Sequence, residues 1–210
     1  MAKKYFLLFL SLLISAGCGG GSSGGGTASG GSSASVDAAV AQQKIIFAGD
    51  SAAGRGNWSS YFGFPIENKG IDGLESSQLA NMVEGFVASK PNKIFITIGG
   101  NNVFNRREGS VSADVDMIIA RIRLVSPDTQ IFFHSILPVK FEAMNGTIEV
   151  CNNQIQAVCN MRGVRFISIY GLFKSPTTVI NAKYYTQDGI HLNDAGYRVW
   201  AEAIKNLLSS

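Results

Sequence analysis

The sequence predicts one α/β domain built around a mainly parallel sheet with helices on both faces. Short apolar runs rich in β-branched and aromatic residues recur after residue 44, and stretches with helical periodicity separate them. The runs are mostly continuous rather than alternating, which is typical of strands covered on both faces. With 210 residues, 46% of them hydrophobic and 16% charged, the chain is long enough for one such domain and too apolar to be disordered throughout.

Four apolar runs are expected to form strands, at residues 45–48, 94–98, 131–137 and 164–169. A short additional strand near residues 66–68 would bring the sheet to about five strands. Because helical stretches lie between the four apolar runs, the alternation favours parallel pairing and a three-layer arrangement of helix, sheet and helix.

Apolar residues spaced three and four apart predict the helices between these strands. The apolar stripes are formed by Leu79, Met82, Val83 and Phe86, by Val115, Ile118, Ile119 and Ile122, and by Tyr197, Trp200, Ala201, Ile204 and Leu208. Asn193 is placed to cap the last helix. A further helix over 147–162 would separate Cys151 and Cys159 by about 12 Å, which is too far for a disulfide, so these thiols are expected to be unpaired.

The first residues are predicted to be an export signal rather than part of the domain. A basic start, Lys3-Lys4, precedes an apolar run of about ten residues at 5–14, whereas a membrane-spanning helix needs roughly 20. The small residues 15–17 precede Cys18 and resemble a bacterial lipobox, in which a peptidase cuts before a cysteine that carries lipid. Residues 1–17 are therefore expected to be a lipoprotein signal peptide and Cys18 the lipidated residue, with ordinary secretory cleavage as the alternative.

Residues 18–43 are predicted to be a flexible tether between this lipid and a folded domain at 44–210. The segment 19–35 contains only Gly, Ser, Ala and Thr, so it cannot bury apolar surface. Gly19 stands where an aspartate would suggest retention at the inner membrane of a Gram-negative cell. We therefore expect an exported bacterial lipoprotein, anchored through its lipid at the periplasmic face of the outer membrane.

Charge and residue usage argue against several other classes of function. The formal net charge of +3 falls to +1 once Lys3 and Lys4 are removed, so the chain has no electrostatic footprint for nucleic acid. Two histidines and three cysteines without ligand-like spacing make a metal site unexpected. No glycine-rich phosphate loop follows the first strand, which argues against a nucleotide-binding protein.

Residues suited to nucleophilic catalysis are predicted at the edge where the carboxyl ends of the parallel strands meet. Ser51 follows the first strand within 49–51, and Asp188 and His191 lie in the loop before the last helix. Because serine is a weak nucleophile alone, His191 is the candidate base, and Asp188 could orient its ring. His134, the other histidine, lies inside an apolar strand and is expected to be a core residue bonded to backbone.

Donors for a negative charge on oxygen are available in the same predicted region. They are the backbone N–H of Ser51, a glycine N–H in the loop 68–73, and the side-chain amide of Asn101. Each of these motifs alone is a common turn. Their joint presence, each in its predicted place, favours acyl chemistry.

These motifs resemble those of the SGNH/GDSL hydrolase family, and the resemblance runs from about Lys44 to the C-terminus. Ser51 matches the first block of the family, Gly73 the second, Asn101 the third, and Asp188-Gly-Ile-His191 the fifth. The resemblance implies a flavodoxin-like αβα sandwich and no cofactor. It also implies that serine is the nucleophile, histidine the base, and glycine and asparagine the oxyanion donors.

The sequence departs from the family pattern at two places. Asn102 stands where the third block usually has aspartate, which would alter loop geometry rather than chemistry. The small, glycine-rich stretch 52–56 stands where the first block usually has hydrophobic residues and threonine, and it could leave an open acyl pocket. The choice of Gly73 over Gly70 depends on the spacing from Asn68.

The resemblance implies a serine esterase or deacylase that forms an acyl-enzyme on Ser51. The expected substrates are esters of small acyl groups such as acetyl on polysaccharide, or lipid esters, at the cell envelope. One alternative is an O-acyltransferase that uses the same triad and passes the acyl group to a sugar hydroxyl. The other is a non-catalytic carbohydrate-binding protein of the envelope, and the oligomeric state is left open.

Overall fold

A computed structural model describes residues 43–209 of the chain. The predicted signal peptide, the lipidation residue Cys18 and all but the last residue of the predicted tether lie outside the described residues. The described part contains a sheet with the strand order β2-β1-β3-β4-β5, in which every neighbouring pair is parallel. Its strands are β1 (Ile45–Gly49), β2 (Glu67–Gly70), β3 (Lys93–Thr97), β4 (Gln130–His134) and β5 (Arg165–Ile167). The predicted five-stranded parallel sheet is confirmed.

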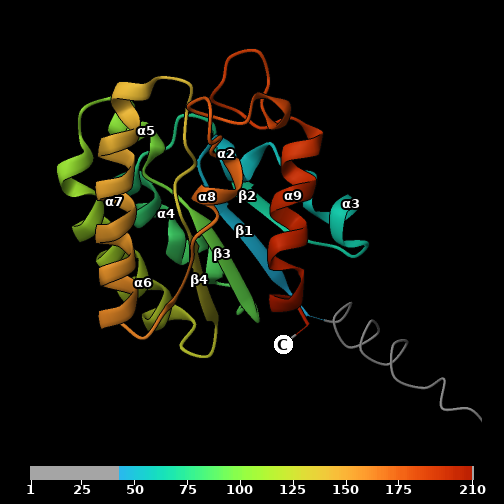
Figure 1. Ribbon diagram of the computed structural model, residues 1–210. Helices are drawn as coiled ribbons and strands as arrows, with labels where there is room; N and C mark the ends of the chain where they lie inside the picture. The colour runs from blue at the N-terminus through green and yellow to red at the C-terminus, as the bar shows by residue number, and fades with distance from the viewer. Residues whose placement is uncertain (1–42, 210) are drawn as a thin grey trace, which may run out of the picture.

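Helices cover both faces of the sheet, so the molecule has three layers (Figure 1). The helices are α2 (Ser51–Gly54), α3 (Trp58–Phe62), α4 (Ser76–Val87), α5 (Gly100–Phe104), α6 (Val111–Val125), α7 (Glu142–Met161), α8 (Tyr170–Phe173) and α9 (Asp194–Ile204). Short 3₁₀ turns lie at Glu108–Ser110, Ala182–Tyr184 and Lys205–Leu207. Helices α4, α6 and α7 pack on one face, and α3, α8 and α9 pack on the other.

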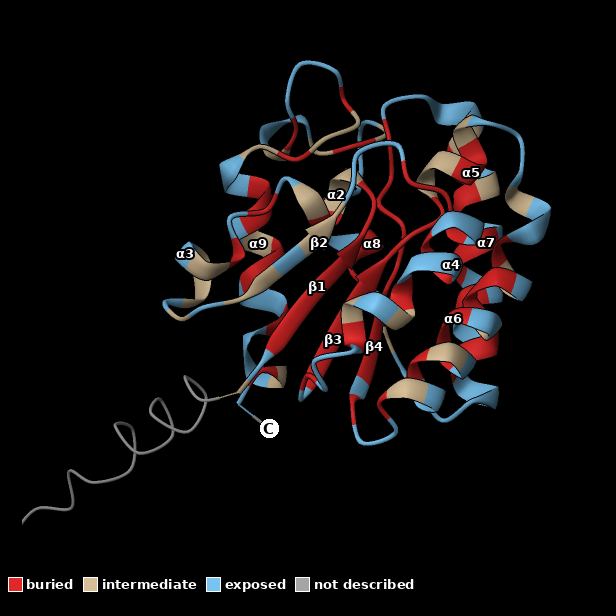
Figure 2. Ribbon diagram, turned by 180° about the vertical axis from the view of Figure 1, so that it is seen from behind, coloured by how far each residue is buried: buried red, intermediate tan, exposed pale blue. Residues whose placement is uncertain are grey.

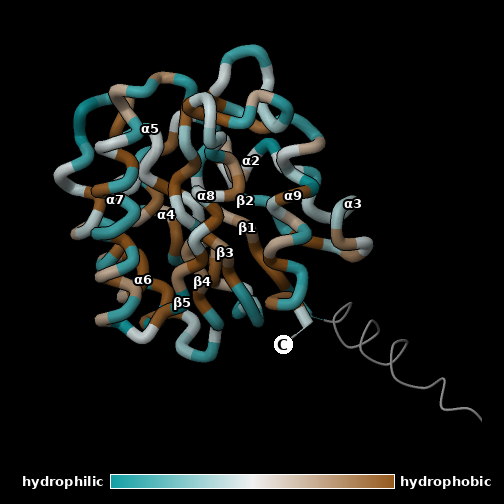
Figure 3. Tube along the Cα trace, viewed as in Figure 1, coloured by the Kyte–Doolittle hydropathy of each residue, from teal (hydrophilic) through white to brown (hydrophobic). Residues whose placement is uncertain are grey.

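The central strands are buried on both sides, as their continuous apolar sequences predicted (Figures 2 and 3). Successive residues of β1 alternate between the two hydrophobic cores: Ile46 packs with α4 and α6, whereas Phe47 packs with α3 and α9. The Phe47 ring stacks on Trp58 at 4.3 Å and on Phe95 at 4.9 Å between ring centroids. This aromatic layer lies beneath the end of β1 and gives it a rigid support.

The predicted fourth strand is shorter than its apolar sequence suggested. Strand β4 ends at His134, although the buried run continues to Val139. Beyond the strand, the backbone N–H of Ile136 donates to the Asn152 side chain and that of Val139 to the Asn145 side chain. Two asparagines of α7 thus replace the neighbouring strand as hydrogen-bond partners, and periodicity alone could not reveal this.

Most of the helical predictions are confirmed, with one correction on α4. Met82 was expected on the buried stripe, but it is exposed because the core-facing residues of α4 are Leu79, Ala80 and Val83. Asn193 caps α9 as predicted, and its side chain accepts a hydrogen bond from the Gly196 N–H. No helix among residues 43–209 is long and apolar enough to cross a membrane.

The two cysteines of α7 are unpaired, as their spacing predicted. Cys151 and Cys159 are both free and buried in the core beside α6. Burial raises the pKa of the Cys159 thiol to about 12, so the group stays neutral. Both side chains therefore serve as small hydrophobic packing residues.

His134 is a core residue, as predicted, but its hydrogen-bond partner differs from the one expected. It lies fully buried on β4 beside Phe95 and Trp200, with ring centroids 5.6 and 5.2 Å away. Its Nδ1 is 3.3 Å from the Thr97 hydroxyl rather than bonded to backbone. His134 therefore belongs to the aromatic layer and leaves His191 as the histidine available for chemistry.

Candidate active site

Ser51 lies at the carboxyl end of the interior strand β1, where α2 begins. The Asp50 side chain caps α2 by accepting from the Ala52 N–H at 2.9 Å. The Asp50 N–H donates to the Thr97 carbonyl at 3.2 Å and so continues the pairing of β1 with β3 past the end of the strand. The indole of Trp58 donates to the Ala53 carbonyl at 2.8 Å. The Asp50 cap and the buried Trp58 indole together hold α2, the short helix that carries Ser51, in place.

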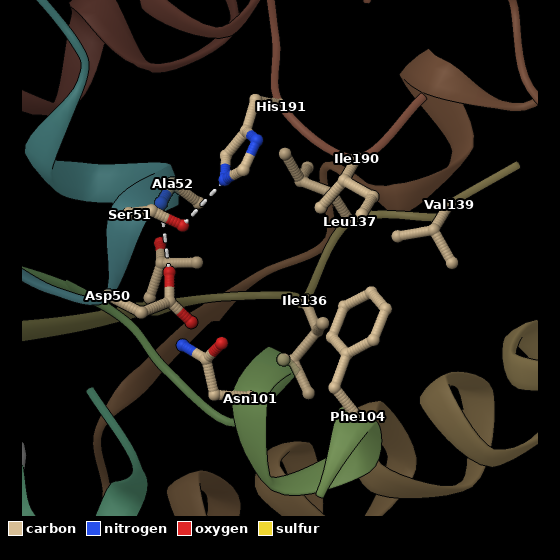
Figure 4. Close-up of a pocket in the computed structure, with 12 residues that line it drawn as sticks. Asp50, Ser51, Ala52, Asn101, Phe104, Ile136, Leu137, Val139, Ile190 and His191 are labelled. Atoms are coloured by element: carbon tan, nitrogen blue, oxygen red, sulfur yellow. Dashed lines mark hydrogen bonds between the residues drawn. The ribbon is translucent and has the colours of Figure 1, made fainter. Parts of the chain in front are cut away.

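Figure 4 shows the imidazole of His191 directed at the Ser51 hydroxyl. The distance from His191 Nε2 to Ser51 Oγ is 3.1 Å, and the distance from His191 Nδ1 to Asp188 Oδ2 is 2.7 Å. The structure therefore brings together the nucleophile, base and orienting carboxylate predicted from the sequence. An imidazole held this way can accept the serine proton at Nε2 while Asp188 holds the proton on Nδ1.

The carboxylate of Asp188 is kept ionised by its hydrogen bonds. Partial burial acts to raise its pKa, but the bonds from the His191 ring and from backbone and hydroxyl donors hold the pKa of Asp188 well below its usual range. Its Oδ1 accepts from the N–H of Ile190 at 2.8 Å, the N–H of His191 at 3.0 Å and the Thr186 hydroxyl at 2.8 Å. The ionised group fixes the tautomer of His191 and stabilises the imidazolium that would form during attack.

A glycine-dependent turn places the Asp188–His191 loop against the segment after β4. Gly189 has a φ of +65°, and its carbonyl accepts from the Lys140 N–H at 2.8 Å. A Cβ at Gly189 would lie 2.4 Å from the Lys140 side chain, so a larger residue does not fit. The phenol of Tyr185 adds a bond to the Pro138 carbonyl at 2.7 Å. Glycine here serves the close approach of the loop rather than general flexibility.

Of the predicted oxyanion donors, Ser51 and Asn101 lie at the starts of α2 and α5, and Gly73 lies in the turn after β2. Asn101 is in the first turn of α5 and lines the active-site cavity, and its Nδ2 donates to the Leu74 carbonyl at 3.0 Å. Gly73 is exposed in the turn 71–74 with a φ of +78°, and it is not among the residues that line the cavity. Leu74, which follows it, connects this turn to Asn101.

Gly70 has a structural role that separates it from Gly73. The Gly70 N–H donates to the Asn68 side chain at 3.0 Å, so this donor is already used. A Cβ at Gly70 would lie 2.1 Å from the backbone nitrogen of Gly54, which shows how closely β2 packs against α2. Gly73 therefore remains the candidate donor of this loop.

A cavity of about 210 Å³ opens beside Ser51 and has one polar and one apolar side (Figure 4). Its polar side is formed by Asp50, Ser51, Thr97, Asn101 and His191, and its apolar wall by Phe104, Ile136, Leu137, Val139 and Ile190. The sequence pattern does not reveal this wall, because its residues come from three separate segments: the end of α5, the segment after β4 and the histidine loop. A partial sequence signal for this wall is Ile190, an apolar residue that lies between the candidate catalytic residues Asp188 and His191.

The glycine-rich stretch 52–56 does not form an open acyl pocket, and that prediction is wrong. Ala52 lines the cavity, but Gly54 and Gly56 serve packing. A Cβ at Gly54 would lie 2.9 Å from the Gly70 carbonyl oxygen, and one at Gly56 would lie 2.4 Å from the Trp58 indole. Glycine is needed at both positions because β2 and the Trp58 ring leave no room for a side chain.

Asn102, which was expected to alter the geometry of its loop, is held by a buried hydrogen-bond network. Its side chain accepts from the Ser76 N–H at 3.0 Å and donates to the Ser76 hydroxyl at 2.9 Å. That hydroxyl donates to the Asp114 carboxylate at 2.5 Å. An aspartate at 102 would lose the donor and bring a second carboxylate near Asp114, so the amide suits this site.

Asp50 is a further ionisable group of the cavity, seen in the sequence only as part of a motif. It is buried, and burial raises its pKa to about 7 against the lowering effect of bonds from the Ala52 and Gly100 N–H groups. Near neutral pH this carboxyl can therefore be protonated, which limits negative charge beside the reacting atoms. Among residues 43–209, no group of three or more His, Cys, Asp or Glu side chains could hold a metal ion.

One family of known proteins matches most of the chain. The model of the GDSL-like lipase/acylhydrolase family matches residues 17–199. A search of curated proteins found no match.

Three solved structures share the fold at low sequence identity. A structure from Streptococcus pneumonia, provisionally assigned as a platelet activating factor, has a TM-score of 0.69 and 24% identity over 83% of this chain and 92% of that chain. A catalytic mutant of an acetylxylan esterase from Geobacillus stearothermophilus has a TM-score of 0.68 and 17% identity over 80% of this chain and 94% of that one. A GDSL-like lipase from Bacteroides thetaiotaomicron has a TM-score of 0.63 and 20% identity over 83% and 94%.

At these identities the structural likeness shows the fold, whereas the family match spans most of the chain, including Ser51, Asn101 and the Asp188–His191 loop. The chain belongs to the GDSL-like lipase/acylhydrolase family, and it is a serine ester hydrolase of the SGNH type.

Proposed function

We propose that the protein hydrolyses esters of small acyl groups through an acyl-enzyme on Ser51. The observation that carries this proposal is the continuous hydrogen-bonded line from Ser51 through His191 to Asp188, at 3.1 and 2.7 Å. The cavity beside it, with one apolar wall, has room for an acyl group next to the nucleophile.

In the first half of the reaction, Ser51 Oγ attacks the carbonyl carbon of the ester while His191 Nε2 takes its proton. The negative charge on the former carbonyl oxygen is stabilised by the N–H groups of Ser51 and Gly73 and by the Asn101 amide. The Nδ2 of Asn101 carries two hydrogens, and the Leu74 carbonyl occupies one of them. The bond to the alcohol oxygen then breaks, and His191 gives that oxygen the proton.

In the second half, a water molecule attacks the acyl carbon and His191 takes a proton from it. The bond between the carbon and Ser51 Oγ breaks, the serine regains the proton, and the carboxylic acid leaves. The same two residues thus act in both halves, and no cofactor enters the sequence of steps.

The cavity volume supports acyl groups from acetyl to a few carbons. At about 210 Å³ it is somewhat larger than the roughly 150 Å³ of an engineered cavity that binds benzene. We propose that the natural substrate is a polysaccharide of the cell envelope that carries acetyl or other small acyl groups. The N-terminal sequence supports that location.

Two measurements test the chemistry with the full-length chain. Hydrolysis of p-nitrophenyl esters, from acetyl to long-chain, should vanish in Ser51→Ala, and a fluorophosphonate probe should label Ser51 in the wild type. The matched control is Ser60→Ala, which changes an exposed serine of α3 and should hydrolyse like the wild type. Undiminished hydrolysis in Ser51→Ala would contradict the proposal, and acyl transfer to an added glycan without hydrolysis would identify a transferase.

We also propose that the mature protein is a lipoprotein at the periplasmic face of an outer membrane. Its support is the basic start, the apolar run 5–14 and the small residues before Cys18. Labelled palmitate should be incorporated into the wild-type chain and not into Cys18→Ala, which should move to the soluble fraction. Cleavage and release of the wild type without label would instead indicate ordinary secretion.

A further inference from the structure

A charged pair joins the nucleophile's helix to the loop that carries Gly73. Arg55 directly follows α2, and its N–H donates to the Ser51 carbonyl at 3.1 Å. Its guanidinium donates to the Asp72 carboxylate through Nη2 at 2.6 Å and through Nε at 3.2 and 3.3 Å. Asp72 lies directly before Gly73. The pair is therefore a two-point contact between the segment after Ser51 and the candidate oxyanion loop.

The other side of Gly73 is anchored as well. Leu74 is buried, its N–H donates to the Ile71 carbonyl at 3.2 Å, and its carbonyl accepts from Asn101 at 3.0 Å. The residues on both sides of Gly73 are thus tied to elements that carry catalytic candidates. Asp72 is tied to the end of α2 and Leu74 is tied to α5.

This arrangement constrains the one group of Gly73 that the reaction would use. Its N–H belongs to the peptide unit that joins Asp72 to Gly73, so holding Asp72 limits the rotation of that unit. With a φ of +78°, Gly73 lies in a region that favours glycine, and within the turn the only restraint described above is the bond from the Leu74 N–H to the Ile71 carbonyl. An oxyanion donor is effective only when it lies about 2.7–3.1 Å from the developing charge.

We propose that Arg55 and Asp72 are positioning residues that hold the Gly73 N–H in the orientation that stabilises the oxyanion. This inference rests on the proposed function of Ser51. It also assigns a role to Arg55, which lies in the stretch 52–56 where the sequence departs from the family pattern.

A role in holding the fold explains the pair less well. The two side chains are 45% and 58% exposed, and exposed ion pairs contribute little to stability because solvent screens them. The pKa of Asp72 is held below its usual range, mainly by the Arg55 hydrogen bond, with His191 among the smaller causes. Asp72 is therefore ionised at neutral pH and lies within electrostatic reach of the triad.

The test compares Arg55→Ala and Asp72→Asn with the wild type, with p-nitrophenyl acetate as substrate. We expect kcat to fall about 10-fold, with KM within about 2-fold and an unchanged melting temperature. The loss is smaller than the 10²–10³-fold cost of deleting an oxyanion donor, because the N–H is loosened and not removed. Arg55→Lys should restore part of kcat, since lysine keeps the charge but not the two-point contact.

A second readout separates positioning from a general effect on structure. Phenylboronic acid forms a tetrahedral adduct with a reactive serine, so its inhibition constant should rise in proportion to the loss of kcat. The matched control is Arg162→Ala, which removes an exposed Arg–Asp pair of similar geometry between Arg162 and Asp116, with bonds of 2.5 and 2.6 Å. That variant should keep wild-type kcat.

The outcomes distinguish this inference from the function on which it rests. Hydrolysis that needs Ser51 but is unchanged in Arg55→Ala, or a loss of kcat with unchanged boronate affinity, would overturn the positioning role alone. If Arg55→Ala and the control Arg162→Ala lose kcat to the same extent, the positioning role is also overturned. Wild-type hydrolysis that survives Ser51→Ala would overturn the proposed function instead.

Discussion

Replacing Asp188 by asparagine should lower kcat for ester hydrolysis by roughly 10³- to 10⁴-fold while the fold stays intact. The amide oxygen can still accept the N–H groups of Ile190 and His191 that now bond to Asp188 Oδ1, so the loop keeps its shape. The amide NH₂, however, would face His191 Nδ1, which lies 2.7 Å from Oδ2. That contact selects the tautomer with the hydrogen on Nε2, which then cannot accept the proton of Ser51.

The measurement is steady-state hydrolysis of p-nitrophenyl acetate, with thermal unfolding to verify the fold. KM should change little, because Asp188 acts through His191 and does not touch the ester. The matched control is Asp194→Asn, which alters an exposed aspartate at the start of α9 and should keep wild-type kcat. An Asp188→Asn enzyme within a few-fold of the wild type would mean that His191 does not need its orienting carboxylate.

His134 should make the stability of the protein fall in acid. Burial lowers the pKa of His134 to about 3, so the folded state holds the neutral ring. A histidine in the unfolded chain binds a proton near pH 6.5. The stability contributed by the neutral ring is thus fully present above about pH 6.5 and is lost as the pH falls toward 3. Between pH 6.5 and 4 the loss should be about 3 kcal/mol, at about 1.4 kcal/mol per pH unit.

Urea denaturation of the wild type and His134→Phe at a series of pH values checks this. The difference in unfolding free energy between the two proteins should shift by about 3 kcal/mol between pH 6.5 and 4, because phenylalanine does not titrate. The phenylalanine ring also suits the surrounding aromatic side chains. Asp50, whose pKa burial raises to about 7, changes stability in the opposite sense, but it titrates in both proteins and cancels in the difference. A difference independent of pH would mean that His134 can be protonated in the folded protein.

The fold and the triad could be read from the sequence for the same reason. In a parallel sheet the carboxyl ends of all strands meet at one edge, so residues following different strands become neighbours. Ser51 follows β1 and Asn101 follows β3, and the Asp188–His191 loop returns to the same edge before α9. The apolar runs identified the strands because β1, β3 and β4 are covered on both faces.

What the sequence determined by itself is therefore the order of the strands and the long helices, the family and the identity of the candidate catalytic residues. These depend on local periodicity and on short motifs, which are properties of the sequence and do not depend on which distant segments come into contact.

The tertiary structure alone decided the apolar wall of the cavity, the packing role of the glycines at 54 and 56, and the pairing of Arg55 with Asp72. Each of these depends on which side chains from distant segments come into contact. The pairing of Arg55 with Asp72 joins residues 17 positions apart because β2 lies beside β1 and α2 packs on β2. Such contacts depend on distances between packed elements, and spacing along the chain does not specify them.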